Sequence, residues 1–260
     1  MHHSYMDKLA YRDTMLSLAD PRGKLAATLL YVLALSLVPP AAFGRLGLLA
    51  LLLFGLIMAG DLPKLYVFKR SLLVLPFAGA LALIFPFTQP GPIVGRVAGL
   101  AVTSSGLLLA ATVLLKAMLA AAALLVLAAT TKFSHLTAAL RWYQVPSLFV
   151  DILAFLYRYL FLVVDEAERV GRARRARTPG KLRRPVRTGA AMIATLVGRS
   201  FARSERVFFA MSARGYDGTM RTLDPMPSAG KNIALWIGAG AVALALALAP
   251  MPGWLSRGTP

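Results

Sequence analysis

Arginines stand at the predicted carboxyl ends of two long helices. Arg177 follows Ala176 and precedes a Thr-Pro-Gly turn signal, whereas Arg214 lies between Ala213 and Gly215. A guanidinium at a helix end can enter a groove and donate paired hydrogen bonds to carboxylates or carbonyl oxygens, which a lysine ammonium cannot do in this fork geometry. These positions therefore predict docking to a protein partner.

The sequence lacks the motifs that would bind nucleotide, hold a metal or form a hydrolase site. Each of the three Gly-Lys pairs is followed by Leu or Asn, whereas a phosphate-binding loop needs Ser or Thr after its lysine. No HExxH or GxSxG segment occurs, and three His with no Cys offer no spacing typical of a metal site. We therefore expect no enzymatic activity, no cofactor and no metal ion in this chain.

Two apolar segments contain charged residues that leave two interpretations open. Asp151, with Arg158 two helical turns later, is either a proton site or a charge at the entry of a helix near the membrane surface. Lys116 either marks an ion pathway or snorkels to the membrane interface from a tilted helix. We favour the interfacial interpretation for both.

The composition is that of a membrane protein with a basic surface. Of the 260 residues, 58% are hydrophobic and 15% are charged, and the mean hydropathy is +0.66. The 29 Lys and Arg against 11 Asp and Glu give a net charge of +18, so an anionic lipid bilayer is an expected neighbour. A lipid-bound anchor or an RNA-binding protein would explain the charge but not several apolar spans, and we expect no nucleic-acid partner.

Long apolar runs predict an all-α integral membrane protein with five spans. The expected spans cover residues 25–43, 46–60, 71–87, 97–129 and 233–249. We expect kinks in the third span at Pro76 and Pro86. Residues 61–70 are expected to form a short amphipathic element at the membrane surface. The fourth run is rich in Gly, Ala, Ser and Thr, which favours close helix packing in lipid.

The distribution of basic residues predicts the orientation of the chain. If residues 146–164 lie tilted at the cytoplasmic surface, most of the 29 Lys and Arg lie on the cytoplasmic side. A rival topology keeps this bias by splitting 97–129 into two short spans and letting 146–164 cross. Both topologies place the basic segment before the last span in the cytoplasm. We expect five spans with the amino terminus inside and the carboxyl terminus outside. The expected domains are a four-span membrane domain (1–131), a cytoplasmic coupling-helix module (132–230) and a final span (231–260).

The coupling-helix module is predicted to contain two long helices. The first begins at Pro146, a favoured first helical residue, and ends before the turn at Thr178. Its middle is supported by two pairs of a carboxylate and an arginine four residues apart, Asp165 with Arg169 and Glu168 with Arg172. The second covers residues 188–214 and ends at Gly215, the residue type best suited to a helix C-cap.

Residues of the second helix are expected to form two opposing stripes. The basic stripe contains Arg199, Arg203, Arg206 and Arg214, with Ala210 between the last two. The opposing, mostly apolar stripe contains Val197, Phe201, Ser204, Phe208 and Met211. Two helices with one apolar face and an arginine at the end predict a bracket that binds proteins on two sides.

Three parts of the chain are similar to one known family of transporter subunits. They are residues 6–11 with 20–25, residues 130–133 with 157–167, and residues 199–218. The second includes Tyr157 and Arg158, and the third includes the Ala-Arg-Gly sequence at 213–215. They resemble the T component, the transmembrane coupling subunit of energy-coupling factor (ECF) ABC importers, in its cobalt-type branch, CbiQ.

The resemblance implies roles for the arginines. That family carries Ala-Arg-Gly motifs at the ends of two coupling helices, and their arginines dock into grooves of two ABC-type ATP-binding subunits. Arg214, with Ala213 and Gly215, matches one motif. Arg177, with Ala176, is expected to serve the other, although Thr replaces its Gly, and Arg174 is the alternative register. Arg199, Arg203, Arg206, Tyr157 and Arg158 are expected to support the coupling helices.

The resemblance also implies partners and a place in the cell. The chain would be a scaffold in the bacterial inner membrane that passes ATP-driven motion to a separate substrate-binding membrane S component, with or without a small accessory membrane subunit. Cobalt is the favoured ion, and nickel importers use closely similar subunits. The alternative is a self-contained secondary transporter or channel, which would need polar groups at mid-membrane. Lys116, Ser104 and Ser105 are its only candidates.

Overall fold

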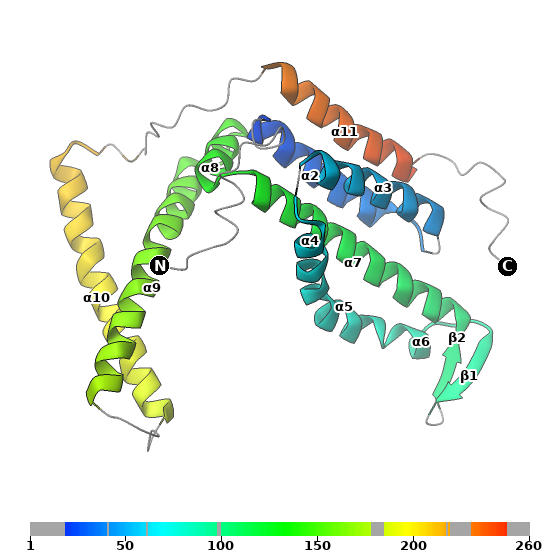
Figure 1. Ribbon diagram of the computed structural model, residues 1–260, viewed down its shortest axis with the longest axis horizontal. Coiled ribbons are helices and arrows are strands. Elements are labelled where there is room, and N and C mark those ends of the chain that lie inside the picture. The colour runs from blue at the N-terminus through cyan, green and yellow to red at the C-terminus, as the bar shows by residue number, and fades with distance from the viewer. Residues whose placement is uncertain are drawn as a thin grey trace. The chain divides into compact units, whose positions relative to one another are not determined.

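The computed structural model describes residues 19–40, 42–60, 62–97, 100–177, 185–216, 218 and 230–248. Nearly all of these residues are helical, as expected for an all-α membrane protein (Figure 1). The chain forms two compact units. One, the membrane unit, contains the described residues up to 136 together with those after 224, and the other, the coupling unit, contains those between 137 and 224.

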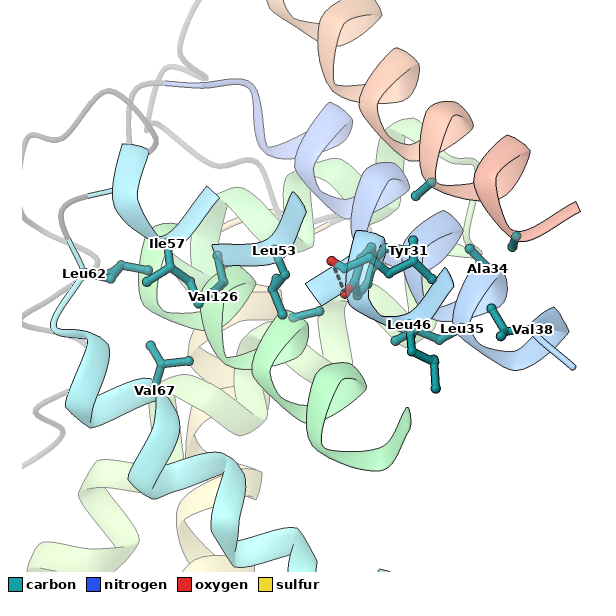
Figure 2. Close-up of a cluster of buried hydrophobic side chains, with 14 of the residues drawn as sticks. Tyr31, Ala34, Leu35, Val38, Leu46, Leu53, Ile57, Leu62, Val67 and Val126 are labelled. Carbon is teal, nitrogen blue, oxygen red and sulfur yellow. Dashed lines mark hydrogen bonds between the residues drawn. The ribbon is translucent and has the colours of Figure 1, made fainter. Parts of the chain in front are cut away.

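Four helices build the core of the membrane unit. They are α2 (Pro21–Leu37), α3 (Phe43–Ala59), α7 (Ser104–Thr130) and α11 (Gly230–Leu248). Their buried side chains form one cluster, drawn in Figure 2, that includes Tyr31, Leu35, Leu49, Leu53 and Val126. The Tyr31 hydroxyl donates to the Leu49 carbonyl oxygen at 3.0 Å, which satisfies the polar end of this ring inside the cluster.

Basic side chains bind the carboxyl ends of three of these helices. Lys24 Nζ donates to the Thr130 carbonyl oxygen at 3.0 Å, and Arg45 donates to that of Ala247 at 2.7 Å. Lys116, whose role the sequence left open, donates to the Val38 carbonyl oxygen at 2.6 Å, just beyond the end of α2. Such cations satisfy terminal carbonyls and complement the helix dipole. The two lysines therefore fasten both ends of α2 to α7.

The boundary expected between the first two spans is wrong. Phe43 was assigned to the first span, but α2 ends at Leu37 and Phe43 is the first residue of α3. The adjacent prolines at 39 and 40 cannot continue a helix, and the chain turns there. The turn is therefore earlier than the apolar run alone suggested.

The surface element and the third span form one interrupted run. It consists of α4 (Lys64–Ser71), a 3-10 turn η1 (Leu72–Val74), α5 (Leu75–Ala82) and α6 (Phe85–Thr88). The expected separation at residue 70 is thus wrong, because α4 passes directly into η1 and η1 into α5 without a loop. The interruptions fall where Pro76 and Pro86 start new helices, as the sequence predicted.

The fourth span starts later than expected. A hairpin of β1 (Ile93–Val97) and β2 (Leu100–Thr103) occupies the first residues assigned to it, and α7 begins at Ser104. The Thr103 hydroxyl accepts from the Gly106 N–H at 3.3 Å, which fixes this helix start. Gly106 also lies against α6, where an added Cβ would stand 2.4 Å from the Phe85 carbonyl oxygen.

Three helices of the described chain are long and apolar enough to cross a membrane. They are Lys64–Thr88, Ser104–Thr130 and Ser147–Arg177, while Phe43–Ala59 and Asn232–Leu248 are apolar but shorter. The third of them contains residues 147–164, nearly all of the segment 146–164 that we placed at the membrane surface. Its length and hydropathy also fit a membrane crossing, as in the rival topology. The split of 97–129 that this topology requires is not seen, because α7 is uninterrupted from Ser104 to Thr130. Whether the segment at the start of α9 crosses the membrane stays a prediction.

The coupling unit consists mainly of two long helices. These are α9 (Ser147–Arg177, 31 residues) and α10 (Pro185–Ala213, 29 residues), close to the predicted bounds. Pro146 precedes α9 instead of beginning it, and its carbonyl oxygen accepts from the Phe149 N–H at 3.1 Å. A shorter helix, α8 (Phe133–Trp142), was not predicted and precedes α9 in the chain.

Replacing Gly240 by Leu should loosen the membrane unit. An added Cβ at Gly240 would stand 3.0 Å from the Ala27 Cα and 2.9 Å from Leu30 Cδ1, so α2 and α11 must move apart. Such overpacking costs about 1–3 kcal/mol. Gly238 on the same helix has open space, so Gly238→Leu is the matched control. Thermal denaturation in detergent should show a lower midpoint for Gly240→Leu alone, and equal midpoints would contradict this packing.

Candidate coupling and docking site

The two long helices of the coupling unit cross and leave an apolar groove between them. Figure 1 shows α9 and α10 as the arms of an X. The groove has a volume of about 550 Å³ and is lined mainly by Phe155, Leu156, Tyr159, Leu162 and Val163 of α9 and by Val207, Phe208 and Met211 of α10. Several of these side chains remain exposed in the chain alone, Leu156 at 59% and Phe208 at 61%. An exposed apolar surface of this kind is typical of a protein-binding face.

An ion pair joins the two helices on the polar side of this groove. Arg199 of α10 donates to the Glu166 carboxylate of α9, and Arg203 also lines the groove. The hydrogen bond from Arg199 lowers the pKa of Glu166 below its ordinary value. Because the pKa is lowered on folding, the pair stabilises the fold at neutral pH and loses that effect as the pH falls through the lowered pKa.

The structure corrects the two predicted stripes of α10. Arg199 and Arg203, expected opposite the apolar stripe, line the same groove as Ser204, Phe208 and Met211. Phe201, expected with these apolar residues, is 69% exposed. The helix presents a mixed face to α9 because Glu166 supplies a partner for arginine there, and the single-helix pattern contained no information about that partner.

The end of α10 presents Arg214 on a well-formed cap. Gly215 has φ +77°, and its N–H donates to the Ser212 carbonyl oxygen at 3.0 Å. The Tyr216 N–H donates to the Met211 carbonyl oxygen at 3.1 Å, which completes a Schellman motif. The predicted C-cap glycine is thereby confirmed. Arg214 itself is exposed and follows the last helical residue, Ala213.

The end of α9 presents Arg177 in a similar position. Arg177 and Ala176 are both exposed in the last turn, whereas Arg174 is half-buried. The Thr178 that stands in place of the usual glycine lies outside the described residues. Of the two possible registers, the one with Arg177 therefore leaves the guanidinium better placed for a partner.

The two arginines are not brought together. Roughly three turns of α9 separate Glu166 from Arg177, and roughly four turns of α10 separate Arg199 from Arg214. Because Glu166 and Arg199 mark the crossing, each arginine lies at the end of a different arm (Figure 1). The geometry therefore keeps Arg177 and Arg214 apart at two separate helix ends.

The other residues that we expected to support the coupling helices lie along α9 and α10. Tyr157 packs edge-on against Phe161, one turn later on α9, at 5.2 Å between ring centroids. Arg158 and Arg206 are absent from the groove lining. Glu168 pairs with Arg172 at 3.2 Å as predicted, and Arg169 lies 4.0 Å from Glu166.

A buried ion pair closes the elbow before α9. Asp151, only 4% exposed, accepts from Arg141 of α8, so its partner is not Arg158. Between the two helices Gln144 adopts φ +59°, which lets the chain turn from α8 into α9 within a few residues. Sequence reasoning missed this pair because the two residues lie on different helices, and no periodic pattern links them. Asp151 therefore forms an ion pair that links α8 to α9.

One protein family and several individual proteins are similar to this chain. The sequence profile of the cobalt transport protein family CbiQ matches residues 12–224. The chain belongs to this family. A cobalt transport protein CbiQ of Rhodobacter capsulatus is 35% identical over 39% of this chain and 42% of its own length. A putative fused cobalt transport protein CbiMQ of Methanocorpusculum labreanum is 29% identical over 84% of this chain and 38% of its own length.

A further relative of this CbiQ-family chain matches at nearly full length. The energy-coupling factor transporter transmembrane protein EcfT of Heliobacterium modesticaldum is 26% identical over 86% of this chain and 88% of its own length. The chain spans less than half of the two relatives named as cobalt transport proteins. The expected resemblance to the T component family is thus confirmed. Residues 6–11, which contributed to that resemblance, lie outside the described part of the chain.

The described residues of this CbiQ-family protein offer little to bind a metal ion. Within the described ranges, no group of three or more His, Cys, Asp or Glu side chains comes together. Several acids instead serve as partners for arginines or cap helices, as Asp20 does by accepting from the Arg22 N–H at 2.8 Å. What the site offers is an exposed arginine at each of two helix ends and an apolar groove.

Exchanging the charges of the crossing pair tests how the CbiQ-family helices are held. Glu166→Arg should place two arginines at the crossing, and their repulsion should move α9 and α10 apart. Combining Glu166→Arg with Arg199→Glu should restore the ion pair and the distance between the helices. The chain has no Cys, so spin labels on cysteines introduced at Ala173 and Ala202 report the distance between the arms. We expect a broader distance distribution in the single variant and recovery in the exchange. A broad distribution in both would show that the pair does not set the crossing.

Proposed function

We propose that this chain is the T component of an ECF-type importer. The observation that carries the proposal is the arrangement of α9 and α10, two crossed helices that each end in an exposed arginine, Arg177 and Arg214. Guanidinium groups at helix ends suit grooves lined with carboxylates and carbonyl oxygens. The relative named as an energy-coupling factor transporter transmembrane protein supports the same role.

The partners at the two arms are two ABC-type ATP-binding subunits. Arg177 lies at the end of one arm and Arg214 at the end of the other, and the arms end at different places, so a single small partner could not cover both (Figure 1). Two copies of one ATPase would each receive one arginine. Closure of the ATPases around ATP would then move the two arms relative to each other about the crossing at Glu166 and Arg199.

The apolar groove between the arms supports contact with a third subunit. Its lining comes from both helices, so any change in their crossing changes the groove. A membrane-embedded S component that binds the substrate would cover this apolar surface and receive the motion. The chain itself then catalyses nothing and holds no cofactor, and ATP hydrolysis belongs to its partners.

Cobalt is the ion that the relatives favour. Two of them are named as cobalt transport proteins, and one of these is a fusion named CbiMQ. The importer would lie in the bacterial inner membrane, with the amino terminus and the coupling unit in the cytoplasm, where ATP is available. A small accessory membrane subunit would fit the same assembly.

Co-purification tests the assembly directly. The tagged chain is expressed with the ATPase subunits and a candidate S component, purified in detergent and weighed by native mass spectrometry. We expect a complex with two ATPases and one S component for each chain. Recovery of the chain without any ATPase would contradict the proposal and favour a self-contained transporter.

A further inference from the structure

A second groove, on the membrane unit, is distinct from the coupling helices. It opens between α3, α4 and α7 with a volume of about 440 Å³. Its lining is apolar except for Lys64 and Ser71, and most of it comes from Phe54, Ile57, Leu65, Phe68, Leu115, Met118 and Leu119. Ser71 is buried and donates to the Phe68 carbonyl oxygen at 2.9 Å. The groove therefore offers almost no directional hydrogen bonds to an occupant.

Positive charge lies at one side of this groove. The Lys64 side chain is exposed, and its ammonium stands 6.0 Å from the centroid of the Phe54 ring on α3. Lys69 and Arg70 add two exposed cations to the same short helix. None of the lining residues is acidic, and Asp61, which precedes α4 in the chain, lies outside the described residues. An anionic group would be attracted to Lys64.

The groove walls are open to the surroundings of the membrane unit. Phe54 is 52% exposed, Leu65 64% and Phe68 57%, although all three are large and apolar. On helices that lie in a bilayer, such side chains contact lipid hydrocarbon. A protein occupant would normally find hydrogen-bond partners in its binding groove, whereas an acyl chain needs none.

We propose that this groove binds an anionic phospholipid, with one acyl chain along the apolar walls and the phosphate at Lys64. Basic pockets between membrane helices bind anionic headgroups for the same physical reason. The site would hold α4 against α3 and α7 through a lipid that bridges them. It uses none of the residues of the proposed coupling function, so either proposal can fail without the other.

Native mass spectrometry of the purified full-length chain tests this site. Phosphatidylglycerol and phosphatidylcholine with identical acyl chains are titrated separately into the detergent solution. We expect the wild type to retain phosphatidylglycerol preferentially, and Lys64→Gln to reduce that preference about fivefold, the effect of one charge near a membrane surface. Lys69→Gln, the same change outside the groove lining, is the matched control and should have little effect.

A second pair of variants tests whether the apolar walls of the groove bind the acyl chain. Ala50→Phe fills the groove and should remove the retained lipid, whereas Leu51→Phe, on the exposed side of the same helix, should not. If Ala50→Phe does not fold, Ala50→Leu replaces it. Equal retention of both lipids by the wild type, or an equal loss in both lysine variants, would overturn the proposal. So would a folded Ala50→Phe variant that keeps the lipid but loses a co-expressed membrane subunit, since the groove would then be a protein interface.

Discussion

Reversing both helix-end arginines should release the ATPase subunits from the chain. Each of Arg177→Glu and Arg214→Glu places a carboxylate where the partner groove is expected to supply carboxylates and carbonyl oxygens. Loss of an arginine at the centre of an interface commonly costs about 2 kcal/mol or more, and the double variant should bind the ATPases at least about 100-fold more weakly. The measurement is the dissociation constant of the purified chain for the ATPases.

The matched control keeps the charge change but moves it away from the helix ends. Arg172→Glu with Arg206→Glu alters one exposed arginine on each of the same helices. We expect this control to retain the ATPases. If both double variants bind equally well, the helix-end arginines are not the docking groups. If both lose the ATPases, the attraction is a general effect of net charge.

Removing Asp151 should destabilise the coupling unit more than removing any exposed acid of α9. The Asp151 side chain is 5% exposed and its partner Arg141 32%, so Asp151→Ala removes the buried carboxylate to which the half-buried Arg141 guanidinium donates. Breaking a buried pair in this way costs about 3 kcal/mol. Thermal denaturation in detergent should show a fall of several degrees in the midpoint.

An exposed pair on the same helix provides the comparison for Asp151. Glu168 and Arg172 are 57% and 58% exposed, and such pairs contribute less than about 1 kcal/mol. Glu168→Ala should therefore leave the midpoint nearly unchanged. Equal shifts for Asp151→Ala and Glu168→Ala would mean that the elbow between α8 and α9 does not depend on the buried pair.

The long helices and their ends could be predicted from the sequence because their signals are local. The apolar runs, the turn residues after Arg177 and the glycine after Arg214 each act within a few residues of the feature they mark. Gly215 does adopt the left-handed conformation that the pattern required. The kinks at Pro76 and Pro86 could be predicted for the same reason, since a proline disrupts the preceding turn wherever the helix lies.

The features that were missed depend on contacts between distant residues. The partner of Asp151 is on another helix, and Lys24 binds a carbonyl oxygen 106 positions away. The hairpin before α7 was hidden because Val and Leu suit both a buried strand and a membrane helix, and only Thr103 marks the change. The mixed polar and apolar face of α10 could not be predicted either, because it depends on the contact of Arg199 with Glu166 on α9.

Cobalt uptake into proteoliposomes tests the central claim most directly. The chain is reconstituted with the ATPases and the S component, and ATP-dependent accumulation of Co²⁺ is compared with that of the chain alone under a proton gradient. A coupling subunit predicts uptake only when all subunits and ATP are present, and no uptake with the Arg177→Glu and Arg214→Glu double variant. Uptake by the chain alone, without ATPases, would contradict the account.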